Sequence, residues 1–144
     1  MYARDHLLKA MKYYQKLYLK LSERVRDTYE ITHIEFDIVA FLSNNPQYNT
    51  AKDICEMKML IKSSVSAAIE DLSTRGFISC AVDQNDRRIV RLNFLPKADA
   101  LRNDIHLVQK EFSRVLFDGI PQDEIESFFS TLSKINENAI NKME

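Results

Sequence analysis

The sequence has 144 residues, of which 45% are hydrophobic and 28% are charged, a composition typical of a globular domain rather than a disordered chain. No apolar run approaches the roughly 18–20 residues that a membrane span requires, and the N-terminal residues lack the apolar segment of a signal peptide. The two cysteines are therefore expected to be free thiols in a reducing cytoplasm rather than a disulfide.

The formal net charge is only −1, but it is distributed unevenly. Residues 1–30 carry +3 and residues 50–97 carry +2, whereas residues 31–49 carry −2 and residues 98–144 carry −4. A basic surface covering the whole protein is excluded, so any nucleic-acid binding must depend on local geometry.

The first predicted element is a long helix over residues 4–27, in a chain with only two glycines and three prolines. Its apolar stripe recurs at steps of three and four residues and comprises Leu7, Met11, Tyr14, Tyr18, Leu21 and Val25. A helix so rich in tyrosine and leucine needs a surface to pack against, and a second copy of the chain is one candidate.

Two capping signals follow this helix. Thr32 and Glu35 have the spacing of a capping box and predict a helix that ends at Asn44-Asn45-Pro46. Asn49 or Thr50, with Asp53 in the first turn, predicts a short helix that ends at about Met57.

A tight connection then leads into a helix within residues 61–75, which Gly76 ends. Its predicted core face consists of Val65, Ala68, Ile69 and Leu72. The opposite face carries Ser63, Ser66, Ala67, Glu70 and Thr74, with Ser64 and Asp71 on its flank. This face is small and polar near its N-terminus, so it can lie deep against another surface.

Residues 77–82 and 88–95 are rich in β-forming residues and predict a hairpin with a polar tip over residues 83–88. Residues 97–118 predict a further helix that stops near Gly119. Pro121 is expected at the first position of the last helix, whose apolar stripe comprises Ile125, Phe128, Phe129, Leu132, Ile135 and Ile140.

This order of elements predicts a mainly α fold (α+β) that contains a winged helix-turn-helix with a two-stranded wing. The second helix of such a pair enters the major groove of DNA, and cationic groups at the tip of the wing reach the minor groove. Arg87 and Arg88 are then groove or phosphate contacts, and Lys62 is a phosphate anchor. Ser63, Ser64 and Ser66 would donate to phosphates or bases. The alternative is a solvated hairpin whose arginines pair with Asp83 or Asp86.

The stretch IKSSVSAAIEDLSTRGFI, followed by DQNDRRIVRLNFLPKADAL, resembles the recognition helix and wing of MarR-type transcriptional regulators. The most specific parts are the Lys-Ser-x-Val-Ser stretch that begins at Lys62 and the Asp-x-Arg of Asp86 and Arg88. Chain length and the long terminal helices match as well, so the resemblance covers essentially the whole sequence.

The resemblance implies a homodimer that binds a pseudo-palindromic DNA operator, with repression relieved by a small ligand or by oxidation. Residues 1–30 and 98–144 would form the helical dimerisation region, and residues 31–97 the DNA-binding region. Within the wing, Asp86 would brace the loop and Arg88 would reach the minor groove.

Two departures from the family pattern stand out. Ala67 occupies a position where the family often has arginine, which removes a guanine reader contributing roughly 1–3 kcal/mol of discrimination. The family's Leu-Thr-x-x-Gly after the wing is replaced here by residues 94–98, and Asn93 becomes a candidate helix cap. The competing function is a ligand-binding or protein-interaction module on this fold with weak or lost DNA binding.

Other chemistry has little support in the sequence. Cys55 and Cys80 are expected to be small buried apolar residues. The histidines His6, His33 and His106 lack the spacing of a metal site, and no enzyme motif or cofactor-binding motif is present. Tyr14, Tyr18 and Phe112 are candidates for an effector pocket, with dimer core as the alternative.

Overall fold

The computed structural model describes residues 2–144 and divides into two compact units. The first unit ends at Lys110, and the second comprises Glu111–Glu144. No helix within residues 2–144 has the length and apolarity needed to cross a membrane.

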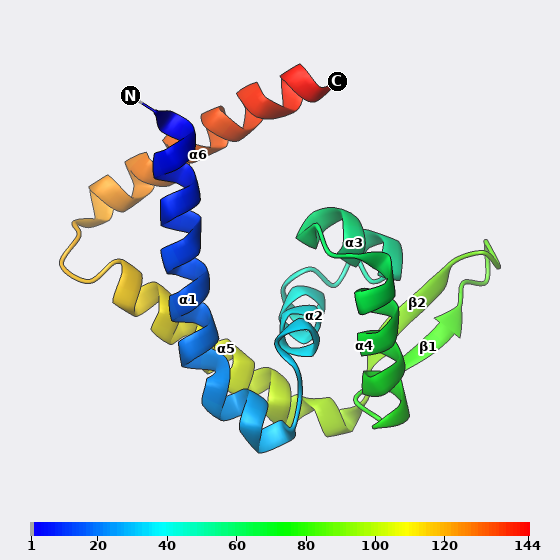
Figure 1. Cartoon of the computed structure of the whole chain (residues 1–144). Helices are drawn as coiled ribbons and strands as arrows, with labels where there is room; N and C mark the ends of the chain where they lie inside the picture. Colours follow the sequence, from blue (N-terminus) through cyan, green and yellow to red (C-terminus); the bar gives the residue numbers. More distant parts are fainter. Residues whose placement is uncertain (1) are drawn as a thin grey trace. The chain divides into compact units, whose positions relative to one another are not determined.

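Six α-helices, a two-stranded antiparallel sheet and one 3₁₀ turn make up the described chain (Figure 1). In chain order they are α1 (Ala3–Tyr29), α2 (His33–Asn44), α3 (Ala51–Lys58), α4 (Lys62–Thr74), β1 (Ile78–Val82), β2 (Val90–Phe94), η1 (Pro96–Ala98), α5 (Asp99–Leu116) and α6 (Gln122–Met143). The predicted fold class is confirmed.

Capping boxes begin both α2 and α3. In α2 the Thr32 backbone N–H donates to Glu35 Oε2 at 2.9 Å, and the Glu35 N–H donates to Thr32 Oγ1 at 3.1 Å. Thr50 and Asp53 form the equivalent pair before α3. Thr50, rather than Asn49, is therefore the cap of that helix.

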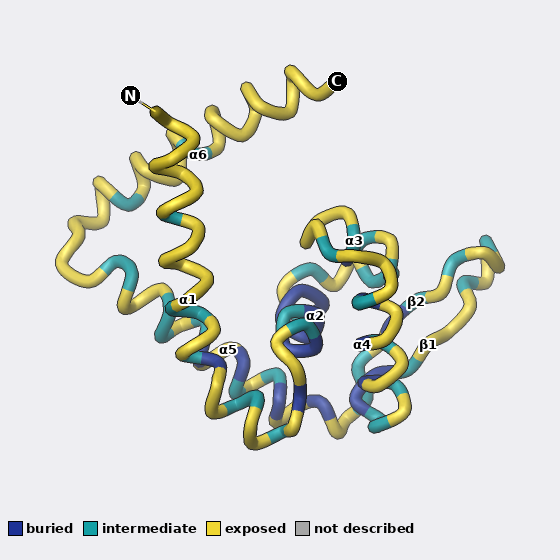
Figure 2. The backbone as a smooth tube through the Cα atoms, viewed as in Figure 1, coloured by how far each residue is buried: buried dark blue, intermediate teal, exposed yellow. Residues whose placement is uncertain are grey.

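The core of the first unit is built around α2, which is buried along most of its length (Figure 2). Val65, Ala68 and Leu72 of α4 pack into it as predicted, while Ile69 is half-buried. The base of the hairpin contributes Phe77, Ile78 and Leu92. Leu101 and Ile105 of α5 belong to the same buried cluster, so the helix-turn-helix shares one core with its neighbours in the first unit.

The terminal helices are far less buried. Leu7, Met11 and Tyr14 are between 43% and 53% exposed, whereas Tyr18 and Val25, further along the same stripe, pack against the core. No residue of α6 is buried. Much of the two predicted apolar stripes therefore faces solvent in the single chain.

Two local predictions were wrong. Asn93 does not cap the helix after the wing, because it lies within β2 paired with Ser79, and η1 begins without a side-chain cap. Pro121 precedes the first position of α6 as its N-cap residue, with an extended ψ of 147°. Gly76 and Gly119 both adopt left-handed φ angles, as expected where a helix ends.

Candidate nucleic-acid interface

Helices α3 and α4 are joined by the three residues Met59, Leu60 and Ile61. Met59 adopts a left-handed φ of 51°, which reverses the chain. Leu60 is half-buried and packs against the core, which fixes the turn from inside. Ile61 is the N-cap residue of α4, has no side-chain capping bond and is 73% exposed.

The predicted DNA-facing residues lie on the first two turns of α4. Lys62, Ser63, Ser66 and Ala67 are exposed, and Ser64 is half-buried. The face opposite them is the buried set that begins with Val65. A surface of small side chains is thus presented at the N-terminal end of the helix.

Asp83 organises the loop between the two strands. Its Oδ1 atom accepts from the backbone N–H groups of Asn85 at 2.8 Å and Asp86 at 3.1 Å, and its Oδ2 atom accepts from Arg91 Nε at 3.0 Å. The Arg91 hydrogen bond is the largest of the influences that lower the pKa of Asp83. The carboxylate therefore holds the loop closed while it remains charged.

Asp86 and Arg88 form a side-on pair at the tip of the hairpin. Arg88 Nε donates to Asp86 Oδ1 at 3.0 Å, and Nη2 donates to Oδ2 at 2.9 Å. This pairing lowers the pKa of Asp86. The Arg88 side chain is nevertheless 90% exposed, and Arg87 makes no ion pair within residues 2–144.

Asn49 connects the hairpin to the start of α3, a link that the sequence did not reveal. Its carbonyl accepts from the Leu92 N–H at 2.8 Å, and its Nδ2 donates to the Leu92 carbonyl at 3.3 Å. Arg91 Nη1 donates to Asn49 Oδ1 at 3.1 Å. Strand β2 is therefore held on one side by β1 and on the other by this residue.

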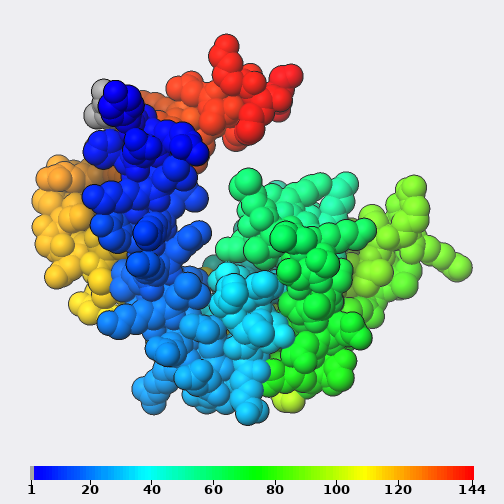
Figure 3. Space-filling view, viewed as in Figure 1, coloured from blue at the N-terminus to red at the C-terminus, as the bar shows by residue number. Residues whose placement is uncertain are grey.

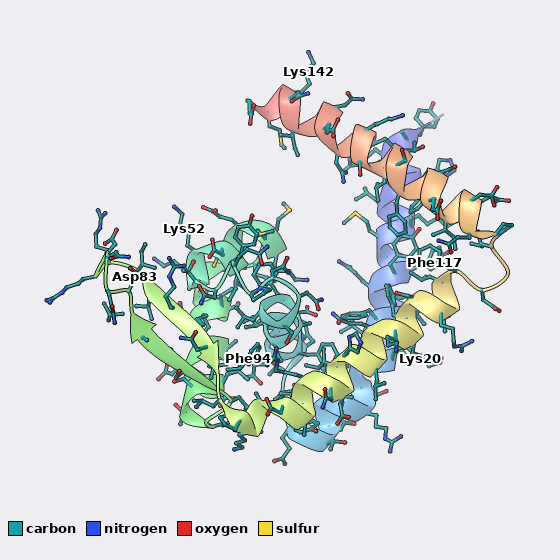
Figure 4. All side chains as sticks on the ribbon, turned by 180° about the vertical axis from the view of Figure 1, so that it is seen from behind. Lys20, Lys52, Asp83, Phe94, Phe117 and Lys142 are labelled. Atoms are coloured by element: carbon teal, nitrogen blue, oxygen red, sulfur yellow. The ribbon has the colours of Figure 1, made fainter. Side chains whose placement is uncertain are left out.

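The hairpin tip projects beyond the helices of the first unit (Figure 3), with Asp83 near its end and Lys52 on the neighbouring α3 (Figure 4). A groove of about 710 Å³ separates α3 from the wing. Cations Lys52, Arg88 and Arg91 line it together with carboxylates Asp53 and Asp86.

Arg75 fastens the C-terminal end of α4 to the end of α1. Its guanidinium donates to the carbonyls of Tyr29 and Glu30 and lies 3.5 Å from Asp71 Oδ2. Lysine or arginine suits such carbonyls because they form the negative end of the helix dipole. Beside it, burial and the Asp71 carboxylate raise the pKa of Glu35.

The sequence matches no protein-family model and no curated protein, but solved structures resemble the chain over nearly its whole length. A MarR transcriptional regulator from Methanosarcina mazei Go1 is 19% identical with a TM-score of 0.77, over 95% of this chain and 98% of that chain. A MarR family regulator from Listeria monocytogenes, complexed with a 26mer DNA, is 18% identical with a TM-score of 0.77, over 99% of this chain and 91% of that chain.

The chain has the MarR fold. A third structure with this fold is BpsR of Bordetella bronchiseptica, whose DNA binding is regulated by 6-hydroxynicotinic acid. It is 17% identical with a TM-score of 0.69, over 91% of this chain and 98% of that chain. These neighbours are regulators rather than enzymes, and the resemblance seen in the recognition-helix and wing sequences is confirmed at the level of the fold.

Within this MarR fold, one predicted effector residue lines a pocket. The pocket has a volume of about 270 Å³ and is lined by Gln15, Tyr18, Leu19, Ser22, His33, Phe36, Asp37 and Leu60. The Tyr18 ring meets that of Phe36 edge-on, with centroids 5.7 Å apart, and burial raises the pKa of Asp37. Tyr14 is not among the lining residues, and Phe112 belongs to the C-terminal unit.

Both cysteines are free, as expected, but only Cys55 packs against the core. The expectation that Cys80 is buried was wrong. Only the first residue of β1, Ile78, is buried, and the strand is exposed from Cys80 onward because the hairpin leaves the body of the first unit. Within residues 2–144, no group of three or more histidine, cysteine or acidic side chains is arranged to hold a metal ion.

Proposed function

We propose that this protein is a cytoplasmic, homodimeric transcriptional regulator that binds a pseudo-palindromic DNA operator and represses transcription until a small-molecule effector releases it. The observation that carries the proposal is a complete helix-turn-helix and wing, in a fold shared along the whole chain with a DNA-bound regulator.

The proposed DNA-binding role is supported by the small side chains at the start of α4 and the arginines of the wing. The major groove is about 12 Å wide and accepts one α-helix, and α4 offers small side chains at its leading end. Asp86 holds Arg88 through Nε and Nη2, so Nη1 is available for a phosphate or a minor-groove edge. Arg87 adds a charge that no protein carboxylate neutralises within residues 2–144.

The homodimer is supported by the exposed apolar faces of the terminal helices. Leu7 and Met11 of α1, and Phe128, Phe129 and Ile140 of α6, are each about half exposed, between 47% and 53%. Exposed apolar faces of this kind mark an interface. A two-fold dimer would present two wings and two α4 helices, which explains a palindromic site.

The effector site is assigned to the pocket beside Tyr18. Aromatic and apolar walls with a few polar groups suit a small aromatic ligand, and BpsR, a neighbour with this fold, responds to 6-hydroxynicotinic acid. Leu60 lines the pocket one residue before the N-cap of α4. A ligand there would therefore act on the start of the DNA-facing helix.

DNA binding is tested by fluorescence anisotropy on duplexes selected from a random library, over a range of salt concentrations. The logarithm of the association constant should fall linearly with the logarithm of salt, and Arg88→Ala should reduce the slope by about 0.9 for each phosphate that the protein no longer neutralises. Lys20→Ala, which removes an exposed cation from α1, is the matched control. Absence of salt-dependent binding to any duplex would instead favour the ligand-binding or protein-interaction module.

A further inference from the structure

The exposed face of α4 carries few side chains that make bidentate contacts with purines. Arginine or lysine reads guanine, and asparagine or glutamine reads adenine; of these four, the helix sequence KSSVSAAIEDLST contains only lysine, at Lys62. A serine hydroxyl accepts from or donates to several bases and discriminates little. Beyond Lys62, sequence preference on this face therefore requires another chemistry.

Apolar groups occupy this end of the helix instead. Ile61 is 73% exposed at the N-cap, and Ala67 is exposed six residues further on. The N-caps of α2 and α3 are the threonines Thr32 and Thr50, which bond the backbone, whereas Ile61 forms no side-chain capping bond. Isoleucine is among the least favourable N-cap residues, and because it is exposed it also lacks the stabilisation that burial would give.

The charges around Ile61 indicate what covers it. Lys58 and Lys62 flank the turn, and no acidic residue occurs between Glu56 and Glu70. An apolar group in a segment that carries lysines and no acid suits a polyanion that carries an apolar group of its own. In the major groove of DNA that group is the C5-methyl of thymine.

We propose that Ile61 and Ala67 read thymine through its C5-methyl group, so that this protein prefers operator half-sites with thymine at the positions facing the start of α4. The inference rests on the proposed DNA-binding function and adds the base that is recognised and the residues that recognise it. The preference comes from burial of methyl groups and not from hydrogen bonds to base edges.

Replacement of single thymines by deoxyuridine tests the inference, because it removes only the methyl group. In a duplex selected by the wild-type protein, replacements at two thymines of a half-site should each weaken binding roughly fourfold, the effect of burying one methyl-sized group. In Ile61→Ser one of these two replacements should have no effect. Serine is a favoured N-cap, so this variant should melt no lower than the wild type, which separates recognition from folding.

Met57→Ser is the matched control, since it removes another exposed apolar side chain, 52% exposed, from α3; its deoxyuridine penalty should equal that of the wild type. Ala67→Ser should abolish the penalty at a second thymine. Equal penalties in wild type and Ile61→Ser, or no penalty at any thymine, would overturn the inference while DNA binding itself stands. Failure of the wild-type protein to bind any duplex would overturn the proposed function and this inference together.

Discussion

Replacing Glu35 with glutamine should stabilise the protein at neutral pH by about 1 kcal/mol, the typical net contribution of one added hydrogen bond. Glu35 is only 6% exposed, and the nearby Asp71 carboxylate adds to the burial that raises its pKa. Glutamine keeps an oxygen that can accept from the Thr32 N–H, so the capping box of α2 survives. Its amide group can also donate to Asp71, which replaces a contact between two acids.

The pH dependence of the stability difference between Glu35→Gln and the wild type tests whether the buried acid is its cause. Burial, followed by the influence of Asp71, raises the pKa of Glu35 in the folded protein. A raised folded-state pKa means that protonated Glu35 contributes stability that is complete below the unfolded-state pKa and is lost as pH rises through the folded-state pKa. Glutamine remains neutral throughout, so its advantage should be largest at neutral pH and should shrink on acidification.

Urea denaturation followed by circular dichroism, at pH 7 and at about pH 4 where an ordinary glutamate is half protonated, measures both effects. Glu35→Ala is the control, because it removes the buried acid and also the acceptor for the Thr32 N–H. The reasoning fails if Glu35→Gln is less stable than the wild type at pH 7. It fails equally if the difference between the two proteins is the same at both pH values.

Three other substitutions test the remaining structural reasoning. Leu72→Ala, at a fully buried position of α4, should lower the free energy of unfolding by about 2–5 kcal/mol in urea denaturation; a smaller loss would contradict its place in the core. Gly76→Ala should lower the free energy of unfolding by about 1–2 kcal/mol in the same assay, because Gly76 has a left-handed φ of 79°. A steric clash is not the cause, since the atom nearest to the added Cβ is Lys97 Cδ at 3.9 Å. Arg91→Ala should weaken DNA binding in the anisotropy assay while leaving the melting temperature nearly unchanged, because it releases Asp83 and Asn49 in an exposed hairpin; unchanged affinity would argue against a role for wing rigidity.

The helix-turn-helix could be predicted from the sequence because its boundaries depend on neighbouring residues. Each capping box consists of two residues three positions apart that exchange hydrogen bonds, Thr32 with Glu35 and Thr50 with Asp53, so the signal is local. Gly76 marks the end of α4 by an equally local signal, because the left-handed backbone conformation that ends the helix favours glycine at that one position. These features need no knowledge of the tertiary structure.

The contacts that hold the wing and α4 in place could not be predicted, because their partners are far apart in the chain. Arg91 and Asn49 are 42 residues apart, and Arg75 and Glu30 are 45 residues apart. Nothing in the spacing of these residues marks them as pairs. The same limitation explains Asn93, which pairs across the hairpin with Ser79 and is therefore not a helix cap.

These long-range contacts connect both ends of α4 to α1, in addition to the packing of α4 in the core with α2. At its C-terminal end α4 is held by Arg75 to the last carbonyls of α1. At its N-terminal end it follows Leu60, which shares a pocket with Tyr18 and Leu19 of α1. The first attachment consists of hydrogen bonds between protein groups, whereas the second borders a space that a ligand can enter. On the proposed function, an effector in this pocket would change the contacts that hold the DNA-facing end of α4. The end held by Arg75 would stay fixed, so the helix would tilt rather than detach.

Arg75→Ala should accordingly reduce the effect of an effector on DNA affinity more than it reduces DNA affinity itself, in anisotropy titrations with and without ligand. Equal loss of both would show that Arg75 serves folding alone.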